Sequence, residues 1–242
     1  MWHIRKIDPA KNVLTKKYIT FVGAGGKSSL IGYLAAQAAG RDKRTAITTT
    51  TRIYAQEPFA LLAGNTVKDA VSANPIRIGK SCDKGKLTSV GFDDVLAMGE
   101  RFDTILIEAD GAKGKPLKYP ALYEPVIPPF SEIIFVVAGL DGLYQPLRDQ
   151  VFRWEMLKEK AGLSGNETIT PELFVSFFSK EMLLKDVDMS VCSIVLNKYD
   201  VCVERDAPLK LAHAIIAKTG IEKILITSLR FGIFVEVGWV DS

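Results

Sequence analysis

The sequence predicts an α/β fold in which a mostly parallel sheet is flanked by helices. Short runs of apolar and β-branched residues alternate along the chain with longer segments of helical periodicity, which is the pattern of strand–helix–strand units. The apolar runs are continuous rather than alternating, as expected of strands covered by helices on both faces. With 242 residues, the chain is long enough for one sizeable domain with a buried core.

The pattern predicts three helices and seven strands. The first strand is expected over residues 18–22, and a helix over 27–39 follows it and ends at Gly40. A second helix is expected over 208–218 with Gly220 as its C-terminal cap, and a third begins at Thr170, where a capping side chain precedes a proline. Further strands are expected over residues 45–49, 104–107, 133–138, 192–196, 224–226 and 233–240. We predict a single domain over 1–242, with an insertion or small subdomain at about 53–101, where the pattern is less regular.

Composition and charge argue against several classes of protein, among them nucleic-acid-binding and membrane proteins. The net charge of +3 and the lack of a basic run argue against nucleic acid or a membrane surface as the main partner. The longest apolar stretch, residues 133–140, is far shorter than the roughly 20 residues that cross a bilayer. Three widely spaced cysteines form neither a disulfide framework nor a zinc motif. We therefore expect a cytoplasmic protein with reduced thiols.

A glycine-rich segment joins the first strand to the first helix. Such a loop turns successive backbone N–H groups toward phosphate oxygens, and the helix N-terminus adds positive potential. A lysine in it neutralises the β- and γ-phosphates of a nucleoside triphosphate, and the next serine ligates Mg²⁺. The strict pattern has glycine at position 21, where this chain has Phe21, and the alternative is a tight turn with an incidental lysine. The predicted nucleotide-binding residues are Gly23, Ala24, Gly25, Gly26, Lys27, Ser28 and Ser29.

Two carboxylates follow the strand at 104–107. Glu108 and Asp110 are two residues apart, so they lie on one face of an extended chain. Carboxylates at the carboxyl end of a strand beside a phosphate loop are suited to manage a magnesium ion and the attacking water. We predict Lys27, Glu108 and Asp110 as catalytic residues and Ser28, Glu108 and Asp110 as metal ligands. A solvated strand end is the alternative.

Two further segments flank the predicted site. Lys113, Lys115 and Lys118 form a basic loop that could hold an anionic substrate or the γ-phosphate, although a solvated lysine cluster fits equally well. Thr49 and Thr50 close the strand at 45–49 and would lie beside the phosphates, although threonine is also a common strand residue. These five residues are the predicted substrate or phosphate loop.

A guanine-specificity pattern follows the strand at 192–196. It consists of Asn197, Lys198, Tyr199 and Asp200, the NKxD arrangement of GTP-binding proteins. The aspartate accepts hydrogen bonds from guanine N1 and the exocyclic amine, which adenine does not offer. Ser228, at the end of the next strand, is expected beside the base. GTP is therefore expected in preference to ATP, with a chance match to a four-residue pattern as the alternative.

With these motifs the chain resembles the YqeC family, accessory proteins for selenium-dependent molybdenum hydroxylases. The resemblance rests on residues 22–28, the threonines at 48–51, the run 108–118, the segment 124–129 and residues 139–141. It implies a P-loop NTPase fold of SIMIBI-like type and a role in making or inserting a molybdenum cofactor. The ending of the 104–107 strand is also similar to that of metallochaperone GTPases, whose cysteine–histidine metal motifs this chain lacks.

The leading hypothesis is a GTP-hydrolysing accessory protein that uses Mg²⁺ and acts on a molybdenum cofactor or a molybdenum hydroxylase client, with a homodimer as one arrangement. The alternatives are an ATP-dependent kinase or ligase acting on an anionic small molecule, and a nucleotide sensor that does not hydrolyse its ligand. These hypotheses differ in base preference and in phosphate release.

Overall fold

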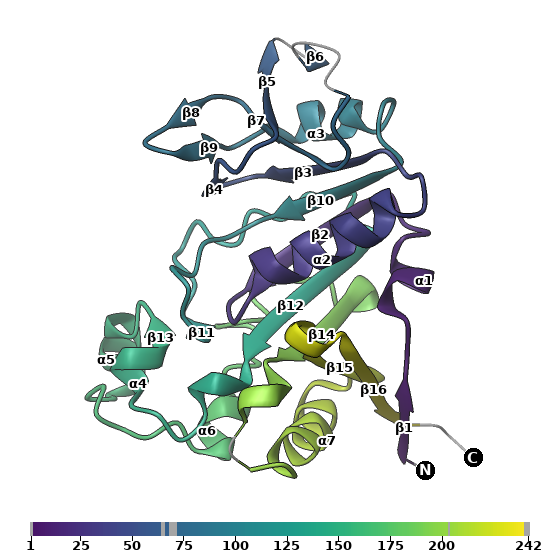
Figure 1. Ribbon diagram of the computed structural model, residues 1–242. Helices are drawn as coiled ribbons and strands as arrows, with labels where there is room; N and C mark the ends of the chain where they lie inside the picture. The colour runs from purple at the N-terminus through teal and green to yellow at the C-terminus, as the bar shows by residue number, and fades with distance from the viewer. Residues whose placement is uncertain (1, 64–65, 68–71, 203, 240–242) are drawn as a thin grey trace.

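The main sheet of the protein has eleven strands (Figure 1). It is seen in a computed structural model that describes residues 2–63, 66–67, 72–202 and 204–239. From one edge to the other the strands are β1 (Trp2–Lys6), β16 (Ile233–Trp239), β15 (Lys223–Ser228), β14 (Cys192–Asn197), β12 (Ile133–Gly139), β2 (Tyr18–Gly23), β10 (Thr104–Glu108), β3 (Thr45–Thr49), β7 (Ile76–Gly79), β5 (Phe59–Ala63) and β6 (Thr66–Val67).

The sheet is mostly parallel. Every neighbouring pair from β15 through to β5 is parallel, whereas β1, β16 and β6 join at the two edges in antiparallel pairs. The predicted α/β class with a largely parallel sheet is confirmed.

Parallel pairing brings the carboxyl ends of the central strands to one edge of the sheet. Strand β2 lies between β10 and β12, with Phe21 in register with Glu108 and Gly23 in register with Val137. On the other side of β12, Gly139 is in register with Asn197 of β14. Ligand sites of open α/β sheets form at such an edge.

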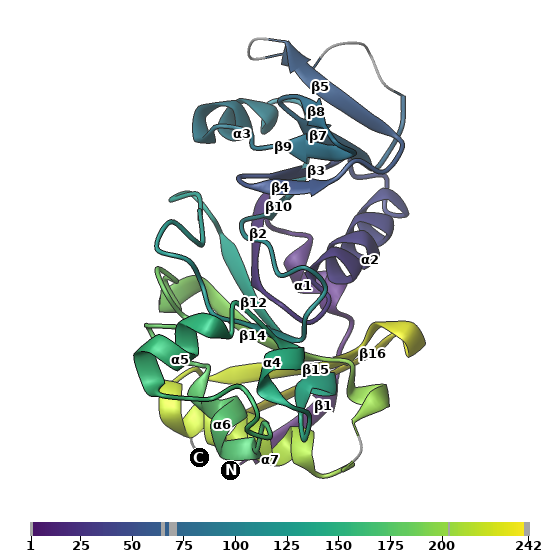
Figure 2. The same cartoon turned by 90° about the vertical axis from the view of Figure 1, so that its left-hand side faces the viewer.

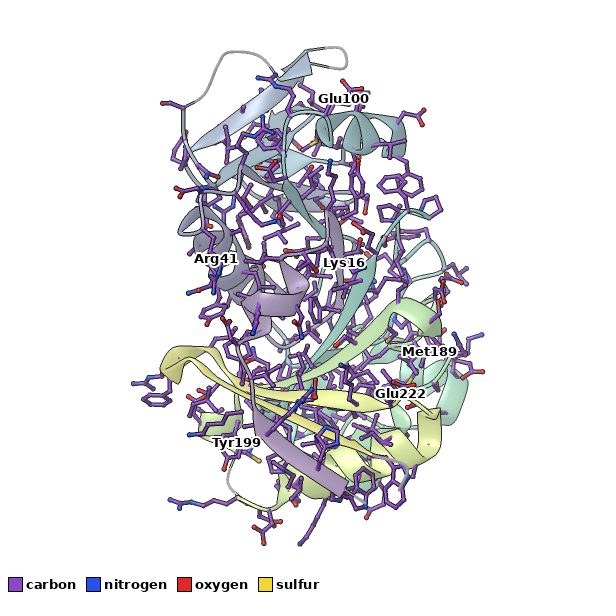
Figure 3. The ribbon with its side chains drawn as sticks, turned by 90° about the vertical axis from the view of Figure 1, so that its right-hand side faces the viewer. Lys16, Arg41, Glu100, Met189, Tyr199 and Glu222 are labelled. Atoms are coloured by element: carbon purple, nitrogen blue, oxygen red, sulfur yellow. The ribbon has the colours of Figure 1, made fainter. Side chains whose placement is uncertain are left out.

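Helices cover both faces of the sheet (Figure 2). Helix α2 (Lys27–Ala39), preceded by the short α1 (Pro9–Val13), packs Leu30, Ile31 and Leu34 on one face. The other face is covered by α3 (Phe92–Met98), α6 (Pro171–Ser176) and α7 (Ala207–Thr219). Side chains fill the space on both sides of the strands (Figure 3). Over the described residues, no helix has the length and apolar character needed to cross a membrane.

Smaller elements lie beside the main sheet. Strands β11 (Leu117–Lys118) and β13 (Val151–Phe152) form a parallel pair next to α4 (Leu147–Gln150) and α5 (Glu155–Ala161). Single 3₁₀ turns span Leu140–Gly142, Met189–Val191, Tyr199–Val201 and Leu229–Phe231.

The predicted elements agree closely with the observed ones. The helix at 27–39 and the strand at 45–49 have the predicted bounds, and Thr170 caps α6 by accepting a hydrogen bond from the Leu173 N–H. Five of the other predicted strands are one to three residues longer than predicted. The last, β16, is described to Trp239, and Val240, predicted in it, is outside the described residues. The segment 53–101 supplies β5 and β7 to the main sheet, and most of a three-stranded sheet of β4 (Arg52–Tyr54), β9 (Lys86–Thr88) and β8 (Cys82–Asp83).

The three cysteines are free thiols in different environments. Cys82 is exposed, whereas burial raises the pKa of the Cys192 thiol to about 12. Because the thiolate is the reactive form, iodoacetamide at pH 8 should alkylate Cys82 rapidly and leave Cys192 unmodified in the folded protein. Peptide mass spectrometry of native and urea-unfolded samples tests this, since all three thiols should react after unfolding. Equal labelling of Cys82 and Cys192 in the native protein would contradict it.

Candidate functional site

The glycine loop, residues 23–26, connects β2 to α2. Gly23, Gly25 and Gly26 all have positive φ, at 92°, 71° and 113°, a region that favours glycine. A Cβ on Gly25 would overlap the backbone of Gly139, and one on Gly26 would lie 2.5 Å from Asn197 Nδ2. The loop therefore has to be glycine-rich to pack against the ends of β12 and β14.

Phe21, at the position where the strict pattern has glycine, still belongs to β2. Its side chain is fully buried and stacks on Phe135 with the ring centroids 5.3 Å apart. The chain turns only at Gly23, two residues later. The departure from the strict pattern therefore contributes to the core and leaves the turn itself unaffected.

Backbone N–H groups around the loop divide into two sets. Those of Gly23, Ala24 and Gly25 donate to Asp110 Oδ2 at 3.0 Å, to the Val137 carbonyl at 2.8 Å and to the Lys115 carbonyl at 2.9 Å. The N–H groups of the next four residues, at the start of α2, donate to no acceptor among the described residues. These residues are Gly26, Lys27, Ser28 and Ser29. Unpaired N–H groups at a helix N-terminus are a ready site for an anion.

Lys27, Ser28 and Glu108 meet next to the loop. The Lys27 side chain is only 4% exposed, and its Nζ donates to the Gly23 carbonyl at 2.5 Å. The Ser28 hydroxyl donates to Glu108 Oε2 at 3.1 Å. Burial raises the pKa of Glu108, against the opposing effects of the Lys27 charge and the Ser28 hydrogen bond. A hydroxyl and a carboxylate so close are hard oxygen donors of the kind that Mg²⁺ accepts.

Asp110, the third predicted metal ligand, is turned toward the protein interior. It belongs to a row of alternating charges that we call the buried ion chain: Lys27, Asp110, Lys118, Glu124 and Arg153. The successive ion pairs measure 3.0, 2.9, 2.7 and 2.6 Å between nitrogen and oxygen. Lys118, predicted as part of a substrate loop, is 1% exposed and lies in the middle of this chain. Burial alone would raise the pKa of Glu124, but hydrogen bonds from Arg153 and Lys118 lower it overall.

The other predicted loop residues lie at the same edge of the sheet. Each of their polar side-chain groups makes a hydrogen bond or a cation–π contact within the protein. The Lys115 ammonium donates to the Asp149 carbonyl at 2.6 Å, and exposed Lys113 lies 5.4 Å above the Phe152 ring centroid. The buried hydroxyl of Thr49 donates to the Glu108 carbonyl at 2.7 Å, and that of Thr50 to the Val126 carbonyl at 2.6 Å. The first bond joins the ends of β3 and β10, and the second ties the residue after β3 to the segment 124–129.

The NKxD segment is joined to the glycine loop through its asparagine. Asn197 Nδ2 donates to the Gly25 carbonyl at 2.9 Å, and Asn197 Oδ1 accepts from Thr227 Oγ1 at 2.9 Å. Ser228 Oγ donates to Asp200 Oδ1 at 2.7 Å. Lys198 has a left-handed backbone, with φ of 65°, and pairs with Asp141 Oδ2 at 2.6 Å. Residues at or just beyond the carboxyl ends of β2, β12, β14 and β15 thus form a polar cluster.

Arg153 is a member of the ion chain that sequence reasoning missed. It contacts Glu124 across 29 positions of the chain and has a positive φ of 63°. Nothing in the local sequence marks such a long-range ion pair. The burial of Lys118, which requires carboxylate partners nearby, is itself seen only in the structure.

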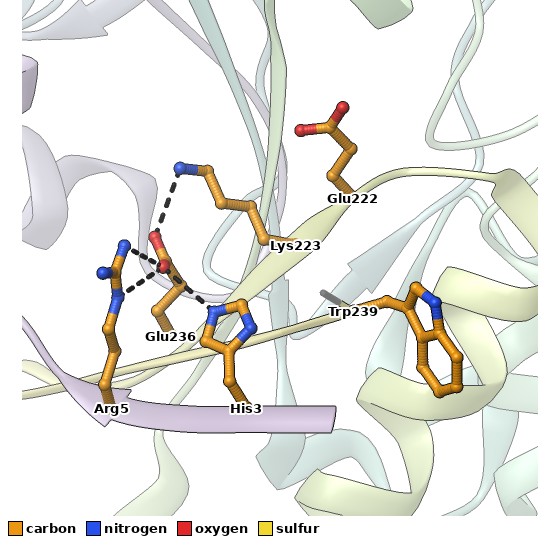
Figure 4. A pocket seen from close by; sticks show the side chains of 6 residues that line it. All are labelled: His3, Arg5, Glu222, Lys223, Glu236 and Trp239. Atoms are coloured by element: carbon orange, nitrogen blue, oxygen red, sulfur yellow. Dashed lines mark hydrogen bonds and ion pairs between the residues drawn. The ribbon is translucent and has the colours of Figure 1, made fainter. Parts of the chain in front are cut away.

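A separate hollow of about 430 Å³ lies away from this cluster, where β15 begins (Figure 4). Its centre is Glu236, which contacts His3, Arg5 and Lys223. The predicted site residues lie instead at the opposite, carboxyl ends of the central strands, so this hollow is distinct from them.

Comparison with known proteins places the glycine loop and the ion chain within one matched region. The sequence model of the YqeC protein family matches residues 19–155. The chain is also similar to the uncharacterised protein YqeC of Escherichia coli (strain K12), at 33% identity over 163 residues. That match covers 62% of this chain and 63% of the relative, less than two thirds of the relative's length. Because the family match spans more than half of the sequence, the chain belongs to the YqeC family.

Proposed function

We propose that this protein is a P-loop GTPase. The observation that carries the proposal is the glycine loop, where unpaired N–H groups at the start of α2 adjoin the Lys27 ammonium and the Ser28–Glu108 pair. Backbone donors, a cation and hard oxygen ligands are the components that bind a triphosphate with Mg²⁺. The strand neighbouring β2 ends in Glu108, so the carboxylate needs no long loop to reach the site.

The chemistry assigned to each residue follows from its position. The N–H groups of residues 26–29 would hold phosphate oxygens, and Lys27 would neutralise the charge that develops on the transferring phosphoryl group. Ser28 and Glu108 would hold Mg²⁺, which supplies charge neutralisation of the β- and γ-phosphate oxygens. Asp110 would act on Lys27 rather than on the metal, because both of its oxygens face lysine ammonium groups.

The base preference is supported by the NKxD cluster. Asp200 is held by Ser228 at the end of β15, and Asn197 connects this region to the Gly25 carbonyl. A carboxylate fixed at the end of β15 favours guanine, which offers two donors on one edge, over adenine. Exposed Lys113 is the residue that would favour the alternative of a kinase or ligase with an anionic substrate.

The biological role that we propose is that of an accessory protein in the maturation or insertion of a molybdenum cofactor into molybdenum hydroxylases. Its support is the resemblance of residues 108–118 and the other motifs to the YqeC family. GTP hydrolysis would then time the release of a cofactor or of a client enzyme.

Thermal unfolding with added nucleotides tests the proposal. A ligand that binds only the folded protein adds about 2.7 kcal/mol at a hundredfold excess over Kd, which for a chain of this size raises the midpoint by about 5–10 °C. We expect this shift with GTP and Mg²⁺, a smaller one with ATP, and a reduced Mg²⁺ dependence in Ser28→Ala.

Phosphate release, measured in the same samples, separates the remaining hypotheses. Binding of GTP without release of phosphate would identify a sensor, and equal shifts with ATP would favour the kinase or ligase. A flat response to every nucleotide would overturn the proposal as a whole.

A further inference from the structure

The buried ion chain holds one more cation than it holds carboxylates. Asp110, whose side chain is 3% exposed, lies between two of these cations, as Glu124 does. Lys27 Nζ lies 3.0 Å from its Oδ1 and Lys118 Nζ lies 2.9 Å from its Oδ2, and the Gly23 N–H donates to Oδ2 as well. One cation is enough to compensate a buried carboxylate, so the presence of two calls for an explanation.

Lys27 is the cation that has to move when a phosphate binds. Its ammonium now contacts the Gly23 carbonyl and Asp110, both on the protein side of the loop. If Lys27 were the sole partner of Asp110, its transfer to a phosphate would leave a buried carboxylate without a counter-charge, which is strongly unfavourable. With Lys118 in place, Asp110 stays compensated whether Lys27 is present or not.

We propose that Lys118 is a standby counter-ion, a positioning residue that allows Lys27 to pass from Asp110 to the phosphates. The proposal rests on the nucleotide-binding function argued above. Lys118 does not reach a ligand itself, because its ammonium is fully used by Asp110, by the Gly111 carbonyl at 2.8 Å and by Glu124 at 2.7 Å. It acts on the phosphate site only through Asp110.

Glu124 gives the proposal a second, opposite consequence. It competes with Asp110 for the charge of Lys118, and it is itself shared with Arg153, whose side chain is 22% exposed. Without the Glu124 charge, Lys118 would compensate Asp110 more fully and Lys27 would be released more readily. Arg153, being partly exposed, keeps water as a partner.

Calorimetric titration with Mg²⁺ and guanosine 5′-(γ-thio)triphosphate, a slowly hydrolysed analogue, tests the coupling. We expect Lys118→Met to weaken binding about tenfold or more and Glu124→Gln to strengthen it about threefold. Lys180→Met is the matched control, because it removes an exposed ammonium that contacts the Val187 carbonyl and not Asp110. Its affinity should stay within about twofold of the wild type, at the scale of an exposed charge.

The double variant Asp110→Asn/Lys118→Met separates positioning from a merely structural role. If Lys118 acts through Asp110, removing both charges frees Lys27 and restores binding to within about threefold of the wild type. Additive losses in the double variant, or equal effects of Lys118→Met and Lys180→Met, would overturn the inference. Should Lys118→Met fail to fold, unchanged or weaker binding by Glu124→Gln would overturn it equally. Absence of binding by the wild type would instead reject the proposed function, and this inference with it.

Discussion

Replacing Lys27 with methionine should lower the affinity for GTP about a hundredfold while the protein stays folded. Hydrogen bonds to charged groups contribute about 1.5–3 kcal/mol each, and the lysine would make more than one to the phosphates. Folding should persist because the ion chain without Lys27 has two cations and two carboxylates, with Asp110 still paired to Lys118. Calorimetry with GTP and Mg²⁺ measures the affinity, and circular dichroism checks the fold.

Lys16→Met is the matched control for this experiment, since Lys16 is an exposed lysine that precedes β2 and lies outside the site (Figure 3). It should bind GTP as the wild type does. If Lys27→Met also binds GTP normally, the glycine loop does not hold phosphates by the proposed arrangement, and the role of its lysine has to be sought within the ion chain alone.

Asp200→Asn should change the preferred nucleotide from GTP to xanthosine triphosphate. The carboxylate accepts from guanine N1–H and the exocyclic amine, whereas an asparagine amide donates to the carbonyl that xanthine has in place of that amine. Loss of two charge-assisted bonds should weaken GTP binding by about two orders of magnitude or more. Competition of each triphosphate against a fluorescent GTP analogue measures the change.

Ser228→Ala gives the comparison that isolates the base contact. It removes the hydroxyl that holds Asp200 at 2.7 Å but leaves the carboxylate in place, so GTP should bind several-fold more weakly with its preference over xanthosine triphosphate retained. An Asp200→Asn protein that still selects GTP would mean that the NKxD segment does not read the base.

The central part of the fold could be predicted from the sequence because its signals are local. Continuous runs of apolar and β-branched residues define β2, β3, β10, β12 and β14, and Gly40 and Gly220 mark the ends of α2 and α7. β1 was not predicted: four of its five residues are exposed, and it is held by pairing with β16 at the far end of the chain. A strand that is stabilised mainly by pairing with another strand shows little hydrophobic periodicity in its own sequence.

The same contrast applies to the candidate site. It could be predicted that Lys27, Ser28 and Glu108 lie close together, because parallel strands end at one edge of a sheet. The burial of Lys118 could not be predicted, because the lysine pairs with Glu124, which is shared with Arg153, and these contacts have no repeating pattern in the sequence. Lys118 was predicted to hold a substrate or phosphate, with a solvated lysine cluster as the alternative, and neither interpretation anticipated a buried lysine paired with Asp110 and Glu124.

The clamped state of the glycine loop has a kinetic consequence. The N–H groups of Ala24 and Gly25 are already bonded to the Val137 and Lys115 carbonyls, and Asn197 donates to the Gly25 carbonyl. A loop fixed in this way has little ordering entropy left to lose when a ligand arrives. Different nucleotides would then associate at similar rates and differ in residence time. The dwell time of the bound nucleotide, rather than the speed of its capture, would determine how long the protein stays in its loaded state.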